Sequence, residues 1–222
     1  MANLGPLHLR VFAALADMQP TPTLFGGAAL IGAYLDHRTT RDTDWVWYQR
    51  QALDELVPVV ADRLRHAELT VADVVRAVSF HRFVVSLGEE VLLIDLVADP
   101  GTPLEPAVAV QIAGISVHVP TRHNLLVDKL CALLSRQEGR DLVDVHALLT
   151  AGADLDRAVA DAPKRDAGYS AMTLVWVLRG WQMASVAKSA GWLAERTALM
   201  AAFRDELVQR LTASAADDVR GR

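Results

Sequence analysis

The sequence is poor in cysteine and in lysine. Its single cysteine, Cys131, excludes a disulfide within the chain, and we therefore expect a cytoplasmic protein. No apolar run approaches the roughly 18 residues of a membrane-spanning helix. The N-terminal segment MANLGPLHLR also lacks the basic start and the long apolar stretch of a signal peptide. Together these absences predict a protein without membrane association.

A strongly basic character is missing as well, since the net charge is −5. This balance does not favour a general nucleic-acid-binding protein. The charge is uneven, because residues 1–120 contain 8 basic and 14 acidic side chains, whereas residues 121–222 contain 14 and 13. With 222 residues, 52% of them hydrophobic, the chain is long enough to bury a core in one large domain or two small ones.

The expected secondary structure changes character near residue 120. Before it, we expect helices over residues 5–18, 28–37 and 51–66, and strands over residues 42–48, 79–87, 89–99 and 112–121. After it, we expect only helices, over residues 122–137, 140–152, 155–162, 169–189 and 190–214. Because the middle strands follow one another without helices, a mixed or antiparallel sheet is favoured over a doubly wound one. The sequence therefore predicts an α+β domain over residues 1–120 and a helical domain over residues 121–222.

Acidic side chains interrupt two apolar strands. Asp42 and Asp44, in RDTDWVWY, are two residues apart and therefore lie on one face of their strand. Asp95 stands alone in LLIDLVA, where a buried carboxylate needs a partner. Two close carboxylates repel unless a cation lies between them, and oxygen ligands of this kind suit Mg²⁺. The pattern predicts a site for Mg²⁺, or Mn²⁺, on two neighbouring strands.

A glycine pair precedes the first of these strands. Gly26 and Gly27 in LFGGAAL begin an expected helix, whose backbone N–H groups could bind the phosphates of a nucleotide. A glycine pair before a helix is by itself most often only a turn. Followed in order by HRTTRDTDW and IDL, however, it indicates a metal–nucleotide site.

Charged residues also recur at helical spacing in the second half. The spacings 7, 4 and 4 separate Lys129, Arg136, Arg140 and Asp144. On one continuous helix they would form a polar stripe, but Gly139 could end that helix and place Arg140 and Asp141 in the first turn of the next. Lys129 is flanked by core positions, so its ammonium either reaches solvent or contacts a phosphate. We favour the phosphate contact.

The segments GG…HRTTRDTDW and VDKLCALLSRQEGRDLVDVHAL resemble the AbiEii/AbiGii-type nucleotidyltransferase toxins, which include the mycobacterial MenT-type toxins. This family belongs to the DNA-polymerase-β-like nucleotidyltransferase superfamily, and the resemblance covers roughly residues 8–150. It implies a nucleotidyltransferase fold, with a small mixed sheet and helices. It also implies transfer of a nucleoside monophosphate from an NTP to an acceptor. By this likeness the acceptor is the 3′ end of tRNA, and the protein is the toxin of a toxin–antitoxin pair with a cognate antitoxin as possible partner.

The resemblance also implies roles for single residues. Gly26 and Gly27 would bind the triphosphate, and Arg38 and Thr40 would belong to the same nucleotide site. The implied metal ligands are Asp42, Asp44 and Asp95. Lys129 would contact the nucleotide phosphates, and Asp141, with Arg140 and Asp144, would complete the site. Ala28 departs from the pattern, because the family often has Thr or Ser after the glycines.

Two other functions remain open. A nucleotidyltransferase that modifies a small molecule, such as an antibiotic, would use the same carboxylates. A decayed domain could instead act as a non-enzymatic binding module. An RNA acceptor would need phosphate contacts from the second half, for which the candidates are Arg179, Arg196, Arg204 and Arg210. The tryptophans of WVW and LVWVLRGW are expected in the core.

Overall fold

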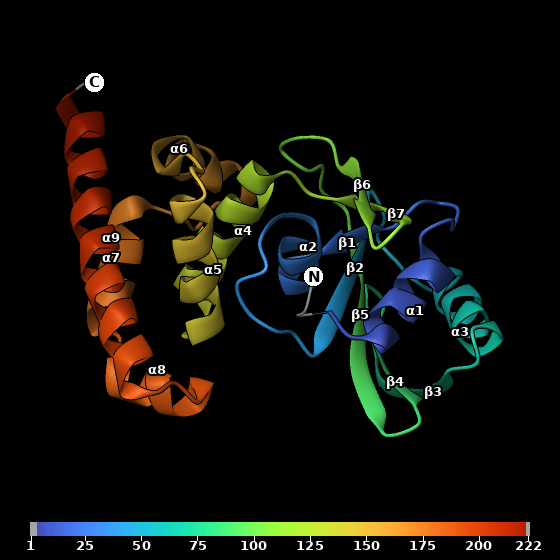
Figure 1. Ribbon diagram of the computed structural model, residues 1–222. Helices are drawn as coiled ribbons and strands as arrows, with labels where there is room; N and C mark the ends of the chain where they lie inside the picture. Colours follow the sequence, from blue (N-terminus) through green and yellow to red (C-terminus); the bar gives the residue numbers. More distant parts are fainter. Residues whose placement is uncertain (1–3, 221–222) are drawn as a thin grey trace. The chain divides into compact units, whose positions relative to one another are not determined.

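The computed structural model describes residues 4–220 and contains two compact units, Met1–Thr121 and Arg122–Arg222 (Figure 1). The first unit combines helices with a sheet, and the second is built from helices. Each unit is described by itself below. The predicted mixed α/β character of the chain is confirmed.

The first unit is organised around a seven-stranded mixed sheet with the order β3-β4-β5-β2-β1-β7-β6. Its strands are β1 (Thr23–Phe25), β2 (Asp42–Tyr48), β3 (Thr70–Arg76), β4 (Phe80–Leu87), β5 (Glu90–Asp99), β6 (Val108–Ile112) and β7 (Ile115–Val119). Two neighbouring pairs, β2 with β5 and β1 with β7, are parallel, and the other pairs are antiparallel. The expectation of a mixed sheet is therefore confirmed.

The two faces of this sheet have different chemistry. On one face, alternate residues such as Trp45, Phe83 and Ile94 are buried, and Phe12 of α1 (Pro6–Leu15) meets Trp45 edge to face at 5.8 Å. Figure 1 shows α1 and α3 (Leu56–His66) together on this side of the sheet. Because side chains alternate along a strand, the residues between the core positions project from the opposite face. That opposite face is where the predicted carboxylates lie.

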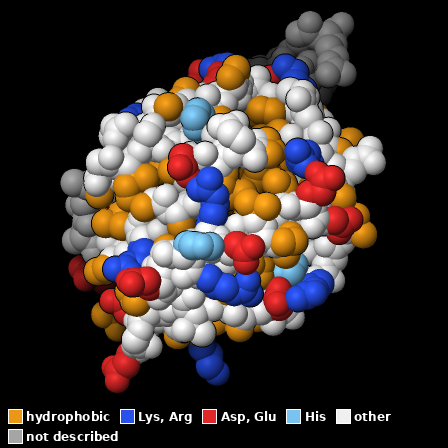
Figure 2. Space-filling view, turned by 90° about the vertical axis from the view of Figure 1, so that its right-hand side faces the viewer, with side chains coloured by type: hydrophobic (Ala, Val, Ile, Leu, Met, Phe, Trp, Pro, Cys, Tyr) orange, Lys and Arg blue, Asp and Glu red, His pale blue; other side chains and the backbone are white. Residues whose placement is uncertain are grey.

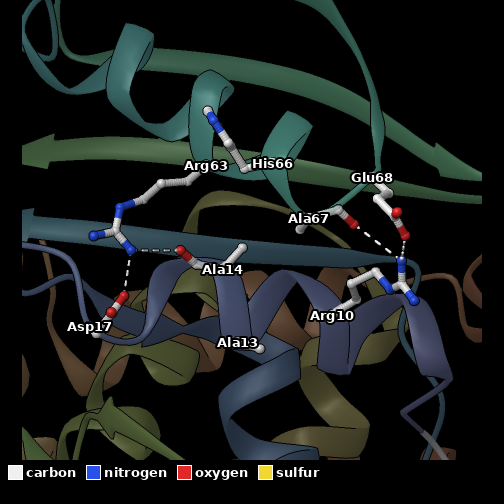
Figure 3. A pocket seen from close by; sticks show the side chains of 8 residues that line it. All are labelled: Arg10, Ala13, Ala14, Asp17, Arg63, His66, Ala67 and Glu68. Atoms are coloured by element: carbon white, nitrogen blue, oxygen red, sulfur yellow. Dashed lines mark hydrogen bonds and ion pairs between the residues drawn. The ribbon is translucent and has the colours of Figure 1, made fainter.

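The outer surface of α1 and α3 carries charges of both signs. Figure 2 shows positive and negative side chains interspersed among apolar ones on this side, so it offers no basic track. In the groove between the helices, Arg63 bonds to Asp17, and Arg10 donates to the carbonyl of Ala67 at 3.2 Å (Figure 3). Exposed ion pairs of this kind contribute about 0–1 kcal/mol each to the stability of the fold. We therefore interpret these contacts as helping to hold α1 against α3, and not as a functional site.

Two strands differ from the sequence-based expectation. β3 was not expected, because it is an edge strand whose side chains are largely exposed and show no apolar alternation. The strand expected over residues 112–121 forms as β7 but begins only at Ile115, because the chain turns at Ala113 and Gly114 with φ of 49° and 85° after an unexpected strand, β6. Short edge strands give weak sequence patterns, since only one side of each strand is paired.

The second unit contains α4 (Arg122–Ser135), α5 (Gly139–Thr150), α6 (Leu155–Arg165), α7 (Ala171–Gly180), α8 (Met183–Ala190) and α9 (Ala194–Arg220). The single helix expected over residues 169–189 is wrong, because Trp181 adopts an extended conformation between α7 and α8. No helix in the range 4–220 combines the length and apolarity needed to cross a membrane.

The tryptophans divide between core and surface. Trp45, Trp47 and Trp181 are buried, as expected. Trp176 is 76% exposed, so its expected place in the core is wrong. The inner positions of α7 are taken by Leu174, Val175 and Leu178, and the helical period turns residue 176 away from them.

Candidate active site

The turn between β1 and the following helix needs both glycines. The helix begins directly at Gly26, as α2 (Gly26–Ala29), and continues as a π-helical turn, Leu30–Tyr34. Gly26 has a φ of +64°, and a Cβ there would collide with the carboxylate of Asp44. A Cβ on Gly27 would lie 2.5 Å from Nη2 of Arg38. The absence of side chains at these positions lets a carboxylate and a guanidinium approach the backbone of this turn.

The three predicted metal ligands lie on one face of two adjacent parallel strands. Asp44 of β2 is directly opposite Asp95 of β5 in the register, and Asp42 lies two residues before Asp44. The hydroxyl of Thr40 donates to Oδ1 of Asp42 at 2.5 Å, which fixes that carboxylate. The structure therefore brings together all the predicted residues of the first unit: Gly26, Gly27, Arg38, Thr40, Asp42, Asp44 and Asp95.

A guanidinium that sequence reasoning did not single out lies within this acidic group. Arg82 of β4 pairs with Asp95 across the strands and donates through Nε and Nη2 to its two oxygens, both at 2.6 Å. These hydrogen bonds raise the pKa of Arg82, and the charges of Asp42 and Asp44 add to the effect. The sequence did contain a signal, because residues 82 and 95 are equally distant from the two-residue turn at Gly88 and Glu89.

His8 is a second residue that sequence reasoning missed. It lies on α1 beside Thr40 and Asp42, and burial lowers its pKa although the charges of Asp42 and Glu90 oppose that shift. Its Nε2 is buried and has no hydrogen-bond partner in the described part of the chain. Burial thus favours the neutral form of this imidazole.

The donor chemistry of this face fits a divalent cation. Three carboxylates outnumber the guanidinium groups of Arg82 and Arg38 on this face and at its turn, and hard oxygen ligands are those that Mg²⁺ prefers. Within residues 4–220, however, no three side chains of Asp, Glu, His or Cys already stand at ligand spacing. Asp95 is held by Arg82 instead. Metal binding by all three aspartates would therefore require their side chains to rearrange.

The second unit holds a separate ionic cluster at the junction of α4 and α5. Nζ of Lys129 lies 2.7 Å from Asp141 and 2.7 Å from Asp144, and Arg136 donates to Asp141 through Nε at 2.8 Å. Both aspartates are fully buried, and Lys129 is nearly so. Burial opposes ionisation of Asp141, but Lys129 and Arg136 outweigh it and hold its pKa below the usual value.

This cluster corrects the interpretation of the charged residues near Gly139. α4 ends at Ser135 and α5 begins at Gly139, so the continuous polar stripe is wrong and the alternative, a new helix at Gly139, is confirmed. Lys129 does not reach solvent, because its ammonium is engaged by two carboxylates. Arg140 bonds to the exposed Glu138 at 2.5 Å, whereas Arg136, which was not among the predicted site residues, binds Asp141.

A family model identifies the chain. The model described as "Nucleotidyl transferase AbiEii toxin, Type IV TA system" matches residues 11–219. The chain belongs to this family. It is thus a member of a nucleotidyltransferase family of toxin–antitoxin systems, as the resemblance of the two sequence segments implied. No match is found among curated protein sequences.

Solved structures agree on the fold. JHP933 from Helicobacter pylori is similar over 97% of this chain and 95% of its own, with 19% identity and a TM-score of 0.58. The antibiotic-resistance factor ANT(2'')-Ia is similar over 75% of this chain and 92% of its own, with 16% identity and a TM-score of 0.52. At such identities the likeness confirms the nucleotidyltransferase fold for the AbiEii-family chain and leaves the acceptor open.

Proposed function

We propose that this AbiEii-family protein transfers a nucleoside monophosphate from an NTP to an acceptor hydroxyl and releases pyrophosphate, with Mg²⁺ or Mn²⁺ at the carboxylates. The observation that supports this most strongly is the shared face of Asp42, Asp44 and Asp95 next to the Gly26–Gly27 turn. A bound cation would neutralise the triphosphate and stabilise the charge that develops on the leaving group. The reaction would take place in the cytoplasm.

The residues of the first unit have distinct parts in this reaction. Gly26 and Gly27 give the triphosphate access to backbone N–H groups, and Arg38 supplies a cation at the same turn. Thr40 orients Asp42 through its hydroxyl. Asp95, once released from Arg82, is placed to accept the proton of the acceptor hydroxyl. Catalysis then depends mainly on positioning and charge neutralisation, as in other phosphoryl transfers.

Residues of the second unit would assist the nucleotide. Lys129 has three N–H donors, of which two are bound to Asp141 and Asp144, so its third donor remains for a phosphate oxygen. Asp141 and Asp144 would then position the ammonium rather than touch the substrate. The proposal that Arg140 binds the nucleotide rests on the family resemblance, and its guanidinium donates to Glu138.

The acceptor that we propose is the 3′ end of tRNA, with the chain acting as the toxin of its pair and an antitoxin as its cognate partner. On α7 the exposed Trp176 and Arg179 are one turn apart, and a base can stack on an exposed indole while a neighbouring cation binds phosphate. Arg179 and Arg196 are exposed, and neither forms an ion pair with the side chains described, those of residues 4–215. Arg204 is less suitable, because it is 18% exposed and donates to the carbonyl of Trp181.

A direct test offers the protein each of the four α-labelled NTPs with total RNA, purified tRNA or a set of aminoglycosides. We expect label on tRNA with one preferred NTP, and none after Asp44→Asn. The exposed Asp54→Asn is the matched control and should retain activity. Label on an aminoglycoside but not on RNA would favour the small-molecule alternative, which the near-neutral charge of residues 121–222 supports. No transfer to any acceptor would contradict the proposed reaction.

A further inference from the structure

Arg82 occupies a place in the first unit that the proposed reaction does not use. Its guanidinium engages both oxygens of Asp95 at 2.6 Å and interacts electrostatically with Asp42 and Asp44. The side chain of Asp95 is 11% exposed and that of Arg82 is 36% exposed. Asp95 is thus largely buried, and Arg82 is the more exposed member of the pair.

The geometry of this pair fixes the position of the Asp95 carboxylate. An arginine that donates two parallel N–H bonds to one carboxylate fixes both the position and the plane of that carboxylate. Arg82 and Asp95 are also direct cross-strand neighbours, so the short β4–β5 turn holds their backbones in register. Each oxygen of Asp95 accepts a hydrogen bond from Arg82, and the proposed function uses the same two oxygens for the metal and for the acceptor proton.

We propose that Arg82 is an internal counter-ion that holds Asp95 in the metal-free protein and is displaced from it when a divalent cation binds. This inference rests on the proposed function, because it assumes that Asp42, Asp44 and Asp95 bind the cation. Without the guanidinium, three carboxylates on one face would repel one another in the metal-free state. With the guanidinium present, metal binding must break the bidentate Arg82–Asp95 pair. Arg82 therefore lowers the affinity of the site, and only a cation that binds the carboxylates more strongly than Arg82 does can occupy it.

The first test measures the affinity for Mn²⁺ by electron paramagnetic resonance without any nucleotide. In Arg82→Met the competing charge is removed while the length of the side chain is kept. The guanidinium repels a cation that approaches the three carboxylates, and Arg82→Met removes this repulsion. We therefore expect Mn²⁺ to bind Arg82→Met about tenfold or more tightly than the wild type. Arg82→Lys, which keeps the charge but loses the planar fork, should lie between the two.

The matched control is Arg76→Met on the neighbouring strand β3. Arg76 pairs with Asp73 at 2.7 Å, so its replacement makes the same change in net charge away from the three carboxylates. Arg76→Met should keep the wild-type Mn²⁺ affinity. Mn²⁺ binding by Arg82→Met that is equal to or weaker than that of the wild type would overturn the proposal that Arg82 competes with the metal for Asp95. If neither the wild type nor any variant binds Mn²⁺, the metal site of the proposed function is itself wrong.

A second measurement uses the wild-type protein and therefore does not depend on the folding of a variant. The Nε–H signal of Arg82, assigned by its loss in Arg82→Lys or by sequential NMR assignment, reports the hydrogen bond to Asp95 directly. Addition of Mg²⁺ should shift this signal in proportion to metal occupancy, measured in parallel by calorimetry. A signal that stays unchanged while Mg²⁺ saturates the site would show that the hydrogen bond from Arg82 to Asp95 persists in the metal-bound protein. That result would refute the displacement of Arg82.

Discussion

The two units each contain a cluster of aspartates and basic side chains, but the clusters are balanced differently. In the first unit, three aspartates, Asp42, Asp44 and Asp95, gather around the guanidinium of Arg82, and that of Arg38 lies at the neighbouring turn. In the second unit, two buried aspartates meet two cations, Lys129 and Arg136. The first cluster is short of positive charge, and the second is neutral.

This difference separates a site that needs a ligand from one that is already satisfied. Like-charged carboxylates crowded on one strand face repel one another in the metal-free protein and favour a cation, which is the usual compromise of functional sites. A neutral buried cluster gains little from a further ion, and loss of one partner would leave an uncompensated charge in the interior. Substitutions in the first cluster should therefore change activity with little loss of stability, whereas those in the second should lower stability in addition to any effect on NTP binding through Lys129.

The largest effect is expected in the first cluster. Asp44→Asn should reduce nucleotide transfer by about 10³-fold or more, because it removes a charge from the proposed metal site directly beside the Gly26–Gly27 turn. The free energy of unfolding of the metal-free protein should stay equal or rise, since a repulsive charge is lost. Label transfer and thermal unfolding of the same preparation measure the two quantities.

The comparison would fail if Asp44→Asn kept the wild-type rate or lost several kcal/mol of stability. Asp54→Asn is again the control, because it makes the same chemical change at an exposed position.

The second cluster should show the opposite pattern. Lys129→Met leaves Asp141 and Asp144 buried without their shared cation and should cost about 3–5 kcal/mol of unfolding free energy. Lys164→Met, which breaks an exposed pair with Asp161, should cost about 0–1 kcal/mol. Urea unfolding followed by circular dichroism measures both. If Lys129→Met had the unfolding free energy of the wild type and lost only NTP affinity, the predicted role in stability would be wrong, and Lys129 would act only in NTP binding.

The pH dependence of stability sharpens the same contrast. The pKa of Asp141 is lowered below 3.8 in the folded protein, so its stabilising effect is fully present above that value and is lost as the pH falls through the folded pKa. The difference in unfolding free energy between the wild type and Asp141→Asn should therefore be constant near neutrality and shrink below pH 3.8. Urea titrations from pH 7 downward test this. A difference that grows on acidification would contradict the assigned ion pairs.

The sequence predicted the acidic face better than the buried cluster for a physical reason. Strand spacing places Asp42 and Asp44 on one face from local rules alone, and the lone Asp95 in an apolar strand required a partner. The partner, Arg82, became visible only with the hairpin register, although the turn at Gly88 and Glu89 could have supplied it. The adjacency of β2 and β5 in a parallel pair depends on tertiary packing.

The second unit shows where periodicity is insufficient. The spacing allowed either one helical stripe from Lys129 to Asp144 or a new helix at Gly139, and the structure joins Lys129 and Asp144 across the break between α4 and α5. Trp176 was expected in the core as part of an apolar run, but it lies one residue after the buried Val175 on α7 and therefore points away from the buried side of the helix. Such errors arise because a run of apolar residues does not say which side of a helix meets the core.

The smallest expected effect concerns the acceptor. If tRNA binds the second unit, Arg179→Glu together with Arg196→Glu should reduce the slope of log affinity against log salt by about 0.7–0.9 for each lost phosphate contact. NTP binding should not change, because both side chains are exposed on α7 and α9 and neither belongs to the Lys129 cluster. Arg65→Glu together with Arg76→Glu makes the same change in net charge on the first unit and should leave the slope intact. If the plots of log affinity against log salt were superimposable for the wild type and the Arg179→Glu, Arg196→Glu variant, these two arginines would have no part in RNA binding. That result would favour a small-molecule acceptor.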